Sequence, residues 1–368
     1  MPTKVLKRTL ILAGVITLLV VVVLALPVQQ WRTGEVTQPE LHYSQTPHDA
    51  VKAARVWIDA DPACGTGKHR DPDDCLALLS LASATSIDIA GISTVFGNAP
   101  VSESDLVMRS LVKEIGTYGG RTVSTTLPVF KGCGAVAPRC LEGGGSLDAQ
   151  TALRLALQRG LLDVVALGPL TNLAALLTRE PALASRITRV IAVMGRRPGH
   201  RFHPSESRAT GAMLFGHGPI FRDLNAVLDT QAVSVILASG IPMVLIPYTA
   251  ARQVSMTGSD LDRIARSGPA GRWAAERSRA WLEFWRDEAG LDGFYPFDLM
   301  AAAYLLDPSR FSCARVTAWV GDDALLPWFG GGPALLITQQ TGLRTPGTAA
   351  FQVLYCDVVR VTVEELFR

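Results

Sequence analysis

Two short segments constrain the fold of this chain most. In the first, apolar residues are followed by two acids, and in the second, acidic residues precede an expected helix. Residues 56–58 (Val-Trp-Ile) are typical of a buried strand, and Asp59 and Asp61 stand at its carboxyl end. A loop of small and basic residues follows, and residues 71–74 (Asp-Pro-Asp-Asp) then precede apolar residues at helical spacing. The first of these acids suits the N-cap, and the proline suits the first helical position. This order predicts an open α/β sheet, which binds its ligands at the carboxyl ends of its strands.

The acids of these two segments are expected to converge on one crevice. Side chains alternate across a strand, so Asp59 and Asp61 should project to the same side. Asp73 and Asp74 could simply complement the helix dipole, but that interpretation leaves the repulsion within the strand-end pair unexplained. Two like charges side by side need a cation or a shared proton. No zinc-type spacing of His or Cys accompanies them, which favours calcium or magnesium with oxygen ligands.

Strands alternate with helices along much of the chain. Because 48% of the 368 residues are hydrophobic, a large core can form, and the net charge of +2 argues against a nucleic-acid partner. The alternation predicts a mostly parallel sheet with right-handed crossovers and flanking helices. The segments expected are strands at 87–96, 127–130, 162–167, 190–194 and 242–247, helices at 102–115, 146–159, 171–177 and 271–288, and loops at 131–146 and 196–219.

The N-terminus has the pattern of a membrane anchor. A basic cluster precedes an uncharged apolar run, Thr9–Leu26, which ends at Pro27. This run is long for a signal-peptide core and at the short end for a membrane span, and its basic flank should remain in the cytoplasm. We therefore expect residues 1–30 to form an uncleaved, single-pass transmembrane helix in an inner membrane. A linker, 31–54, and a domain of residues 55–368 in the periplasm would follow; secretion after signal cleavage is the alternative.

Six cysteines would then lie in an oxidising compartment. Cys133 and Cys140 share one glycine-rich loop and could form a disulfide. Cys75, Cys313 and Cys356 lie in apolar segments, where we expect reduced core residues. The sequence alone does not choose among the pairings that six cysteines allow.

Further motifs follow in a defined order. They are Gly91-Ile-Ser-Thr-Val-Phe-Gly-Asn98, Ala166-Leu-Gly-Pro-Leu-Thr-Asn172, Val193-Met-Gly195, Asp223-Leu-Asn225 with Asp229, and Asp298 before an Ala-rich helix. With the acidic segments, and from about Arg55 to the C-terminus, the chain resembles the inosine-uridine preferring nucleoside hydrolases. The resemblance implies a Rossmann-like core and calcium-dependent hydrolysis of the N-glycosidic bond of ribonucleosides to free base and ribose. It also suggests dimers or tetramers.

Positions that match the family motifs imply a role for each site residue. Asp61 would be both a calcium ligand and the general base for water. Further calcium ligands would be Asp74, Asp298 and the backbone carbonyl of Thr171. The substrate would be bound or enclosed by Asp73, Asn98, Met194, Asp223 and Asn225, with Asp59 as a supporting acid.

Three departures from the family pattern bear on activity. Residues 63–72 separate the strand-end acids from the helix-opening pair, where the family has about two residues; we expect a surface loop that leaves the acids in place. Asp223 is one methylene shorter than the Glu usual in the family. Phe297 stands where the family often has a His that can protonate a purine. The loop histidines that could supply the proton instead are His200, His203 and His217.

The helix expected at 271–288 carries Trp281 and Trp285. Either ring could stack on a nucleobase, and packing into the core is the alternative for both. Two other functions also stay open. Phe297 and the insertion favour a catalytically degenerate member that binds a nucleoside or ribose without turnover. The strand-end Asp-x-Asp is also found in metal-dependent phosphohydrolases.

Overall fold

The computed structural model describes residues 41–43, 54–65, 67–118, 121–122, 127–142, 148–200, 223–323, 332–340 and 347–367. The expected anchor at residues 1–30, nearly all of the linker, and both His203 and His217 lie outside these ranges. Within them, no helix is long and apolar enough to cross a membrane.

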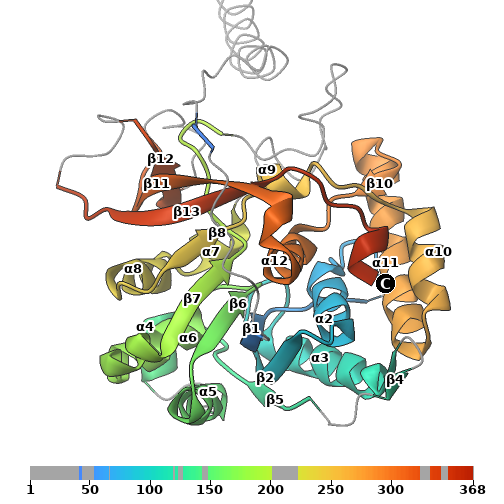
Figure 1. Cartoon of the computed structure of the whole chain (residues 1–368), viewed down its shortest axis with the longest axis horizontal. Helices are drawn as coiled ribbons and strands as arrows, with labels where there is room; N and C mark the ends of the chain where they lie inside the picture. The colour runs from blue at the N-terminus through green and yellow to red at the C-terminus, as the bar shows by residue number, and fades with distance from the viewer. Residues whose placement is uncertain are drawn as a thin grey trace, which may run out of the picture.

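A nine-stranded sheet runs through the centre of the described structure (Figure 1). Neighbouring strands from β13 to β5 are parallel, whereas β11 is antiparallel to both β13 and β12. The mostly parallel α/β sheet is therefore confirmed, and the antiparallel edge was not predicted. In spatial order the strands are β12 (Ala334–Thr338), β11 (Phe311–Gly321), β13 (Phe351–Val358), β8 (Met243–Leu245), β7 (Ile187–Ala192), β6 (Leu162–Ala166), β1 (Ala54–Ala60), β2 (Ile87–Thr94) and β5 (Val129–Lys131).

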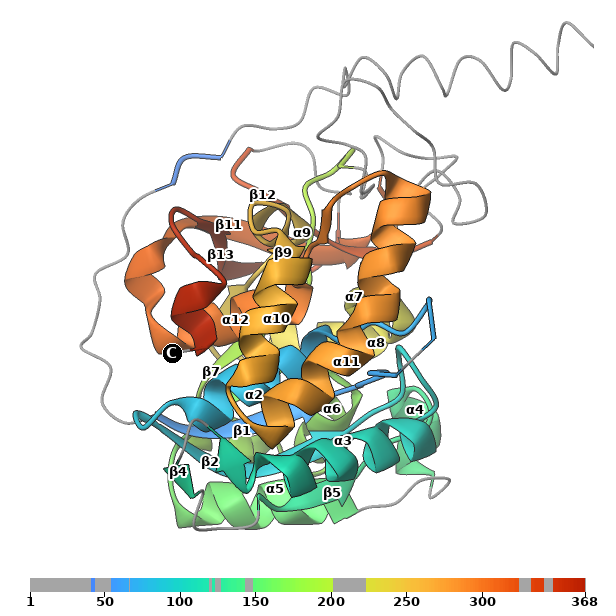
Figure 2. The same cartoon turned by 90° about the vertical axis from the view of Figure 1, so that its right-hand side faces the viewer.

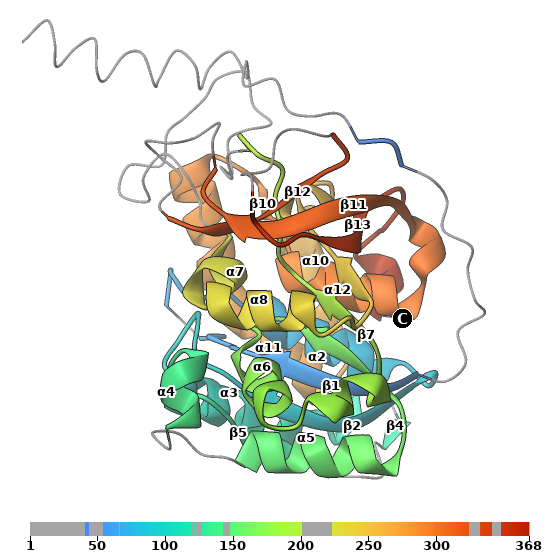
Figure 3. The ribbon, with the colours of Figure 1, turned by 90° about the vertical axis from the view of Figure 1, so that its left-hand side faces the viewer.

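Helices cover both faces of the sheet because side chains alternate along its strands. Val56 and Ile58 pack with one set of helices, whereas Trp57 packs with the other. Figure 2 shows the first set toward the viewer, and Figure 3 shows the second. The first set is α2 (Asp73–Ser83), α3 (Val101–Ile115), α9 (Tyr248–Ala251), α10 (Gly258–Arg266), α11 (Pro269–Phe284) and α12 (Phe297–Leu306). The second set is α4 (Ala137–Leu141), α5 (Asp148–Arg159), α6 (Thr171–Arg179), α7 (Leu224–Leu228) and α8 (Thr230–Ala238).

The expected segments that fall within the described residues agree with this structure apart from local differences, whereas residues 201–219 of the loop expected at 196–219 lie outside the described residues. Helix α4 occupies part of the loop expected at 131–146. The helix expected at 271–288 is α11, which passes into a π-helical turn at Trp285–Ala289. Two small antiparallel ribbons are also present: β3 (Thr117–Tyr118) with β4 (Arg121–Thr122), and β9 (Met256–Thr257) with β10 (Gly293–Phe294). Three short 3₁₀ helices, Pro181–Arg186, Pro308–Arg310 and Glu364–Phe367, complete the described elements.

Three disulfides link the cysteines in pairs: Cys64–Cys75, Cys133–Cys140 and Cys313–Cys356. The pair within the glycine-rich loop is confirmed, whereas the expectation that Cys75, Cys313 and Cys356 are reduced is wrong. Cys313 and Cys356 occupy directly paired positions of β11 and β13, with 4.0 Å between their Cα atoms. Burial is as compatible with a disulfide as with a thiol, and these pairings depend on strand and loop contacts that the sequence pattern did not reveal.

Candidate active site

The carboxyl end of β1 and the start of α2 are joined by atoms of the acidic residues themselves. The backbone N–H of Asp61 donates to Oδ1 of Asp74 at 3.0 Å, and the N–H of Asp74 donates to Oδ1 of Asp73 at 3.0 Å. Helix α2 begins at Asp73 with Pro72 as its N-cap, one residue later than expected. Asp71 accepts from the N–H of Asp73 at 3.3 Å, so it still satisfies a free donor of the first turn.

Asp298, at the start of α12, joins this cluster from a distant part of the chain. Its N–H donates to Oδ2 of Asp73 at 3.1 Å. One carboxylate oxygen from each of Asp73, Asp74 and Asp298 lies within 4.8 Å of the others, and all three side chains are buried. The expected meeting of Asp61 with the helix-opening acids is thus observed, together with the acid before the Ala-rich helix.

Burial disfavours the ionised form of the carboxyl groups in this cluster when no cation is bound. Loss of solvation and, after it, the charge of Asp73 raise the pKa of Asp74 to about 8. Burial and then the neighbouring acids also raise the pKa of Asp61 and of Asp298 well above the usual range. Within the described residues, Oδ2 of Asp74 has no hydrogen-bond partner. Buried carboxylate oxygens, one of them unpartnered, fit a hard divalent cation.

The carboxylate of Asp61 is closely enclosed. Its Oδ2 accepts the backbone N–H of Asn98 at 2.8 Å, just beyond the end of β2. A Cβ atom placed on Gly97 would overlap this carboxylate, and one placed on Gly168 would lie 3.0 Å from it. These two turns can approach Asp61 because both residues are glycine, which leaves the carboxylate little freedom to rotate.

Asp59 has different partners from Asp61. Its Oδ1 accepts from the Ser93 hydroxyl and from the Asn172 amide, each at 2.7 Å. Burial raises the pKa of Asp59 to about 7, although both hydrogen bonds oppose the rise. β1 ends at Ala60, between the two acids, and the expectation that Asp59 and Asp61 project to the same side stays a prediction.

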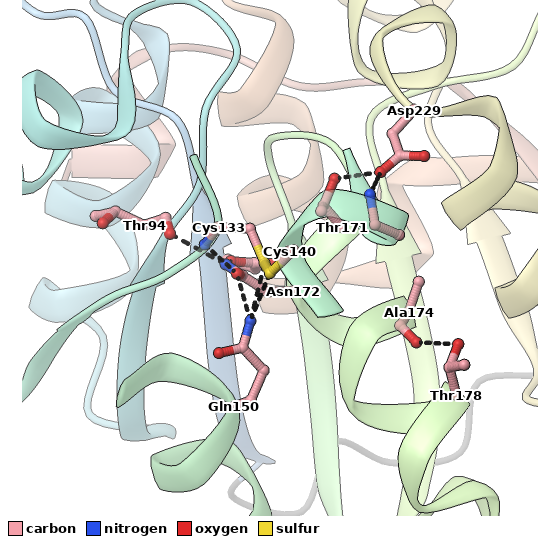
Figure 4. Close-up of a disulfide and its surroundings, with 11 residues drawn as sticks. Thr94, Cys133, Cys140, Gln150, Thr171, Asn172, Ala174, Thr178 and Asp229 are labelled. Atoms are coloured by element: carbon pink, nitrogen blue, oxygen red, sulfur yellow. Dashed lines mark hydrogen bonds between the residues drawn. A yellow bond between two sulfur atoms is a disulfide. The ribbon is translucent and has the colours of Figure 1, made fainter. Parts of the chain in front are cut away.

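Asn172 links Asp59 to the disulfide of the glycine-rich loop. Figure 4 shows its contacts with Thr94, Cys133 and Gln150. Its Nδ2 also donates to the Thr94 carbonyl at 3.0 Å. Its Oδ1 accepts from the Cys133 N–H at 2.8 Å and from Gln150 at 3.2 Å. The side chain therefore holds β2, α5 and the start of α6 around Asp59. The sequence indicated Asn172 only as part of a motif.

Thr171 is buried at the start of α6, where its hydroxyl donates to Oδ2 of Asp229 at 2.7 Å (Figure 4). Asp229 also accepts from the Ala137 N–H at 2.8 Å and from the Ala232 N–H at 3.0 Å, so it ties α6, α4 and α8 together. The role of the Thr171 carbonyl as a metal ligand stays a prediction.

A pocket opens next to the acidic cluster, and all of the predicted substrate residues line it. The predicted residues in its wall are Asp73, Asn98, Met194, Asp223, Asn225, Trp281, Trp285 and Asp298. Residues that the sequence reasoning did not assign to it are Ala63, His69, Asp71, Leu167, Val193, Gly195, Leu224 and Tyr248. Tyr248 directly follows the strand expected at 242–247, so the rule that ligands bind at the carboxyl ends of strands could have identified it.

Two of the polar wall residues are fixed by backbone groups. Asp223 accepts the Gly195 N–H at 2.6 Å, and burial raises its pKa to about 6. Asn225 donates from Nδ2 to the carbonyls of Leu167 at 2.6 Å and Val193 at 3.1 Å, which follow β6 and β7. Asn225 thereby keeps its Oδ1 available as an acceptor.

Aromatic rings form another part of the wall. Phe297 stacks on Tyr248 with 5.7 Å between ring centroids, and its centroid lies 6.3 Å from that of Trp285. Trp281 contacts Trp285 edge to face at 6.2 Å. Both tryptophans pack into the core and also line the pocket, and their indole N–H groups have no partner in the part of the chain that the structure describes.

The insertion at residues 63–72 leaves the acids in place, as expected. The Cys64–Cys75 disulfide closes it, and Lys68 pairs with Asp287 at 3.0 Å. It is not only a surface loop, because Ala63, His69 and Asp71 reach the pocket. The sequence reasoning missed the pocket role of His69, although its position between two site acids was a usable signal. His200 is buried, with its ring 5.9 Å from that of Tyr248, and is not among the pocket residues.

Comparison with known proteins gives matches over most of the described domain. The family model described as inosine-uridine preferring nucleoside hydrolase matches residues 56–326. Pyrimidine-specific ribonucleoside hydrolase RihA of Citrobacter koseri is 26% identical over 296 residues, which cover 73% of this chain and 84% of that protein. RihA of Klebsiella pneumoniae is 26% identical over 287 residues, with the same coverage.

Solved structures show the same fold. A plant nucleoside hydrolase superposes with a TM-score of 0.63 at 20% sequence identity, covering 85% of this chain and 96% of that one. The purine-preferring ribonucleoside hydrolase from Gardnerella vaginalis gives a TM-score of 0.58 at 19% identity, covering 85% of this chain and 95% of that one.

Proposed function

This chain belongs to the inosine-uridine preferring nucleoside hydrolase family, and we propose that it hydrolyses the N-glycosidic bond of ribonucleosides to free base and ribose. The observation that carries this proposal is the buried cluster of Asp61, Asp73, Asp74 and Asp298 beside a pocket with polar and aromatic walls. Cleavage of this bond develops positive charge on the ribosyl carbon, which nearby carboxylates stabilise.

We propose calcium as the metal, held by the side chains of Asp61, Asp74 and Asp298 and by the Thr171 carbonyl. The donor set consists of oxygen atoms, and the unpartnered Oδ2 of Asp74 supports a cation at this point. A bound divalent cation supplies compensating charge to the carboxylates and makes a neighbouring water more acidic.

Asp61 would accept the proton of the attacking water. Its carboxylate is enclosed by Gly97 and Gly168 and is oriented by the Asn98 N–H, so the basic oxygen is held before substrate arrives. Fixing the base in this way removes part of the entropic cost of the reaction. Asp59, which contacts Ser93 and Asn172, would support the strand end and not react.

The polar wall would hold the ribose. Asp73 and Asp223 present carboxylate oxygens to sugar hydroxyls, and Asn225 offers the Oδ1 that its own hydrogen bonds leave available. The aromatic wall would take the nucleobase, with Trp281 or Trp285 stacking on it. The relatives are named pyrimidine-specific and purine-preferring, so both base classes belong in any test.

The test is to measure free base and reducing sugar released by the full-length protein from purine and pyrimidine ribonucleosides without phosphate. Stoichiometric release of both products supports hydrolysis. Nucleoside binding without release would favour a degenerate binding protein. Activity on phosphate esters alone would favour a phosphohydrolase.

We also propose that the domain lies in the periplasm, tethered to the inner membrane by residues 1–30. Three disulfides suit an oxidising compartment, and the basic flank before Thr9–Leu26 favours this orientation. A reporter fused to the C-terminus tests the topology, since a reporter active only in the cytoplasm would contradict it. Detection of a mature chain that lacks the apolar run would favour secretion.

A further inference from the structure

The insertion brings an imidazole to the aromatic wall of the pocket. His69 lies within residues 63–72, between the two segments that supply the acidic cluster, and is the only histidine among the described residues of the pocket wall. Its ring contacts Phe284 edge to face, with 4.9 Å between centroids. Phe284 in turn stacks on Trp281 at 5.0 Å. His69 therefore belongs to the same cluster of rings that we assign to the nucleobase.

Several contacts hold the loop in this position. The disulfide Cys64–Cys75 closes its base, immediately after Asp74 in the sequence. Lys68 pairs with Asp287 at 3.0 Å beyond the end of α11, and Arg70 pairs with Glu103 at 2.6 Å on α3. The Arg70 N–H also closes a turn onto the Gly67 carbonyl at 3.1 Å. His69 thus lies between two anchored neighbours, and its place at the pocket is a property of the loop.

The reaction needs a proton donor on the nucleobase side. A base that leaves as an anion is a poor leaving group, and proton transfer to it contributes about 10²–10⁴ in rate. Phe297, in the wall where the family often has His, cannot donate a proton. Imidazole is the side chain most suited to this transfer near neutral pH.

We propose that His69 donates a proton to the departing nucleobase; this inference rests on the proposed hydrolase function. As the C1′–N bond breaks, its electron pair stays on the base nitrogen, and the base takes the proton of His69 at that or another ring nitrogen. The water oxygen bonds to C1′, and its proton passes to Asp61. His69 is exposed to solvent and regains a proton there, while Asp61 loses one, so the net reaction is nucleoside plus water to base plus ribose.

Asp71 is the acid of the described wall that lies closest to His69 in the sequence, and it is a competing donor. It accepts the N–H of Asp73 and therefore belongs to the acidic cluster, on the side assigned to the sugar. His69 has the ring contacts instead. A substitution at each residue separates the two assignments. Loss of the true donor should slow hydrolysis of substrates with a poor leaving group and leave those with a good leaving group unaffected.

The test compares ribonucleosides with p-nitrophenyl riboside, whose leaving group needs no proton. His69→Gln should lower kcat/KM for ribonucleosides by about 10²–10⁴ and leave p-nitrophenyl riboside hydrolysis near the wild-type rate. His42→Gln is the matched control and should change neither rate. His42 is exposed, and its hydrogen bond to Gln339 is donated by its backbone N–H. Asp71→Asn, His203→Gln and His217→Gln are made in parallel.

Each outcome bears on His69 separately from the hydrolase proposal. Equal losses of His69→Gln on both substrates, or no loss on either, would overturn its role as the donor. The leaving-group signature in Asp71→Asn or in another histidine variant, and not in His69→Gln, would also overturn it. Failure of the wild-type protein to cleave any riboside would instead refute the hydrolase proposal.

Discussion

The backbone N–H of Asp61 donates a 3.0 Å hydrogen bond to Oδ1 of Asp74 across thirteen positions of sequence. One atom of the strand end is thus fixed directly to one atom of the helix start, and the length of the loop between them does not set their separation. This contact explains why the insertion of residues 63–72 leaves the acidic cluster intact, and why the loop can carry side chains of its own into the pocket.

Asp74→Asn should abolish cation binding while preserving the fold. The amide has nearly the same shape but lacks the charge of the carboxylate whose Oδ2 is unpartnered in the described structure. Calorimetric titration should show a loss of calcium affinity of more than about 100-fold. Substitution of a residue that only hydrogen-bonds to a metal ligand typically costs roughly 10–100-fold. The control is Asp88→Asn, at an exposed acid on β2. Unchanged calcium affinity in Asp74→Asn would refute the ligand assignment.

Metal-free protein should lose stability as pH rises. Burial raises the pKa of Asp59 to about 7 and of Asp74 to about 8, so the folded state retains protons that the unfolded chain has already lost. This stabilisation is complete below the ordinary carboxyl pKa and is lost as pH rises through these raised values. Thermal unfolding with chelator should give a Tm that falls between about pH 5 and pH 9. Saturating calcium should reduce the fall, and a chelated Tm that rises over this interval would contradict the prediction.

Asn172→Ala should destabilise the domain by about 2–4 kcal/mol, because it leaves the buried Cys133 N–H without its partner and removes one hydrogen bond each from Asp59 and from the Thr94 carbonyl. Thr178→Ala on the same helix is the control (Figure 4). That substitution removes only a hydroxyl that donates to its own helix at Ala174. Urea unfolding measures both. Equal effects of the two substitutions would show that the Asn172 network has no special contribution.

All six cysteines should be oxidised in the native protein. Peptide mapping without reductant is expected to recover Cys64–Cys75, Cys133–Cys140 and Cys313–Cys356 as linked pairs. Reduction should lower the Tm, since each cross-link restricts the unfolded chain and is typically worth about 2–4 kcal/mol. Recovery of alkylated Cys75, Cys313 or Cys356 from denatured, unreduced protein would show that the core thiols are free after all.

Periodicity and strand-end chemistry were sufficient to predict the parallel sheet and most of the acidic cluster. Asp61, Asp73 and Asp74 come from adjacent segments, so local rules place them together. Asp298 could be assigned only through the family motif, because no local pattern relates the start of α12 to β1. Their chemical roles stay predictions until they are measured.

Other features depend on contacts that a linear pattern does not encode. Asp59 and Asp61 lie on either side of the end of β1 and have different hydrogen-bond partners, Ser93 and Asn172 for Asp59 and the Asn98 N–H for Asp61. Cys313 and Cys356 pair through the register of β11 and β13, an antiparallel edge that the alternation of strands and helices did not predict. His69 lies at the pocket in a loop whose residues Lys68 and Arg70 pair with the distant residues Asp287 and Glu103.

The most direct measurement is the rate of base release from a ribonucleoside by the full-length protein after chelation and then after added calcium, with Asp61→Asn in parallel. Activity should disappear with chelator and return with calcium in the wild type. Asp61→Asn should stay folded and inactive in both conditions. Full activity in chelator, or undiminished activity of Asp61→Asn, would contradict a metal-dependent hydrolase built on this acidic cluster.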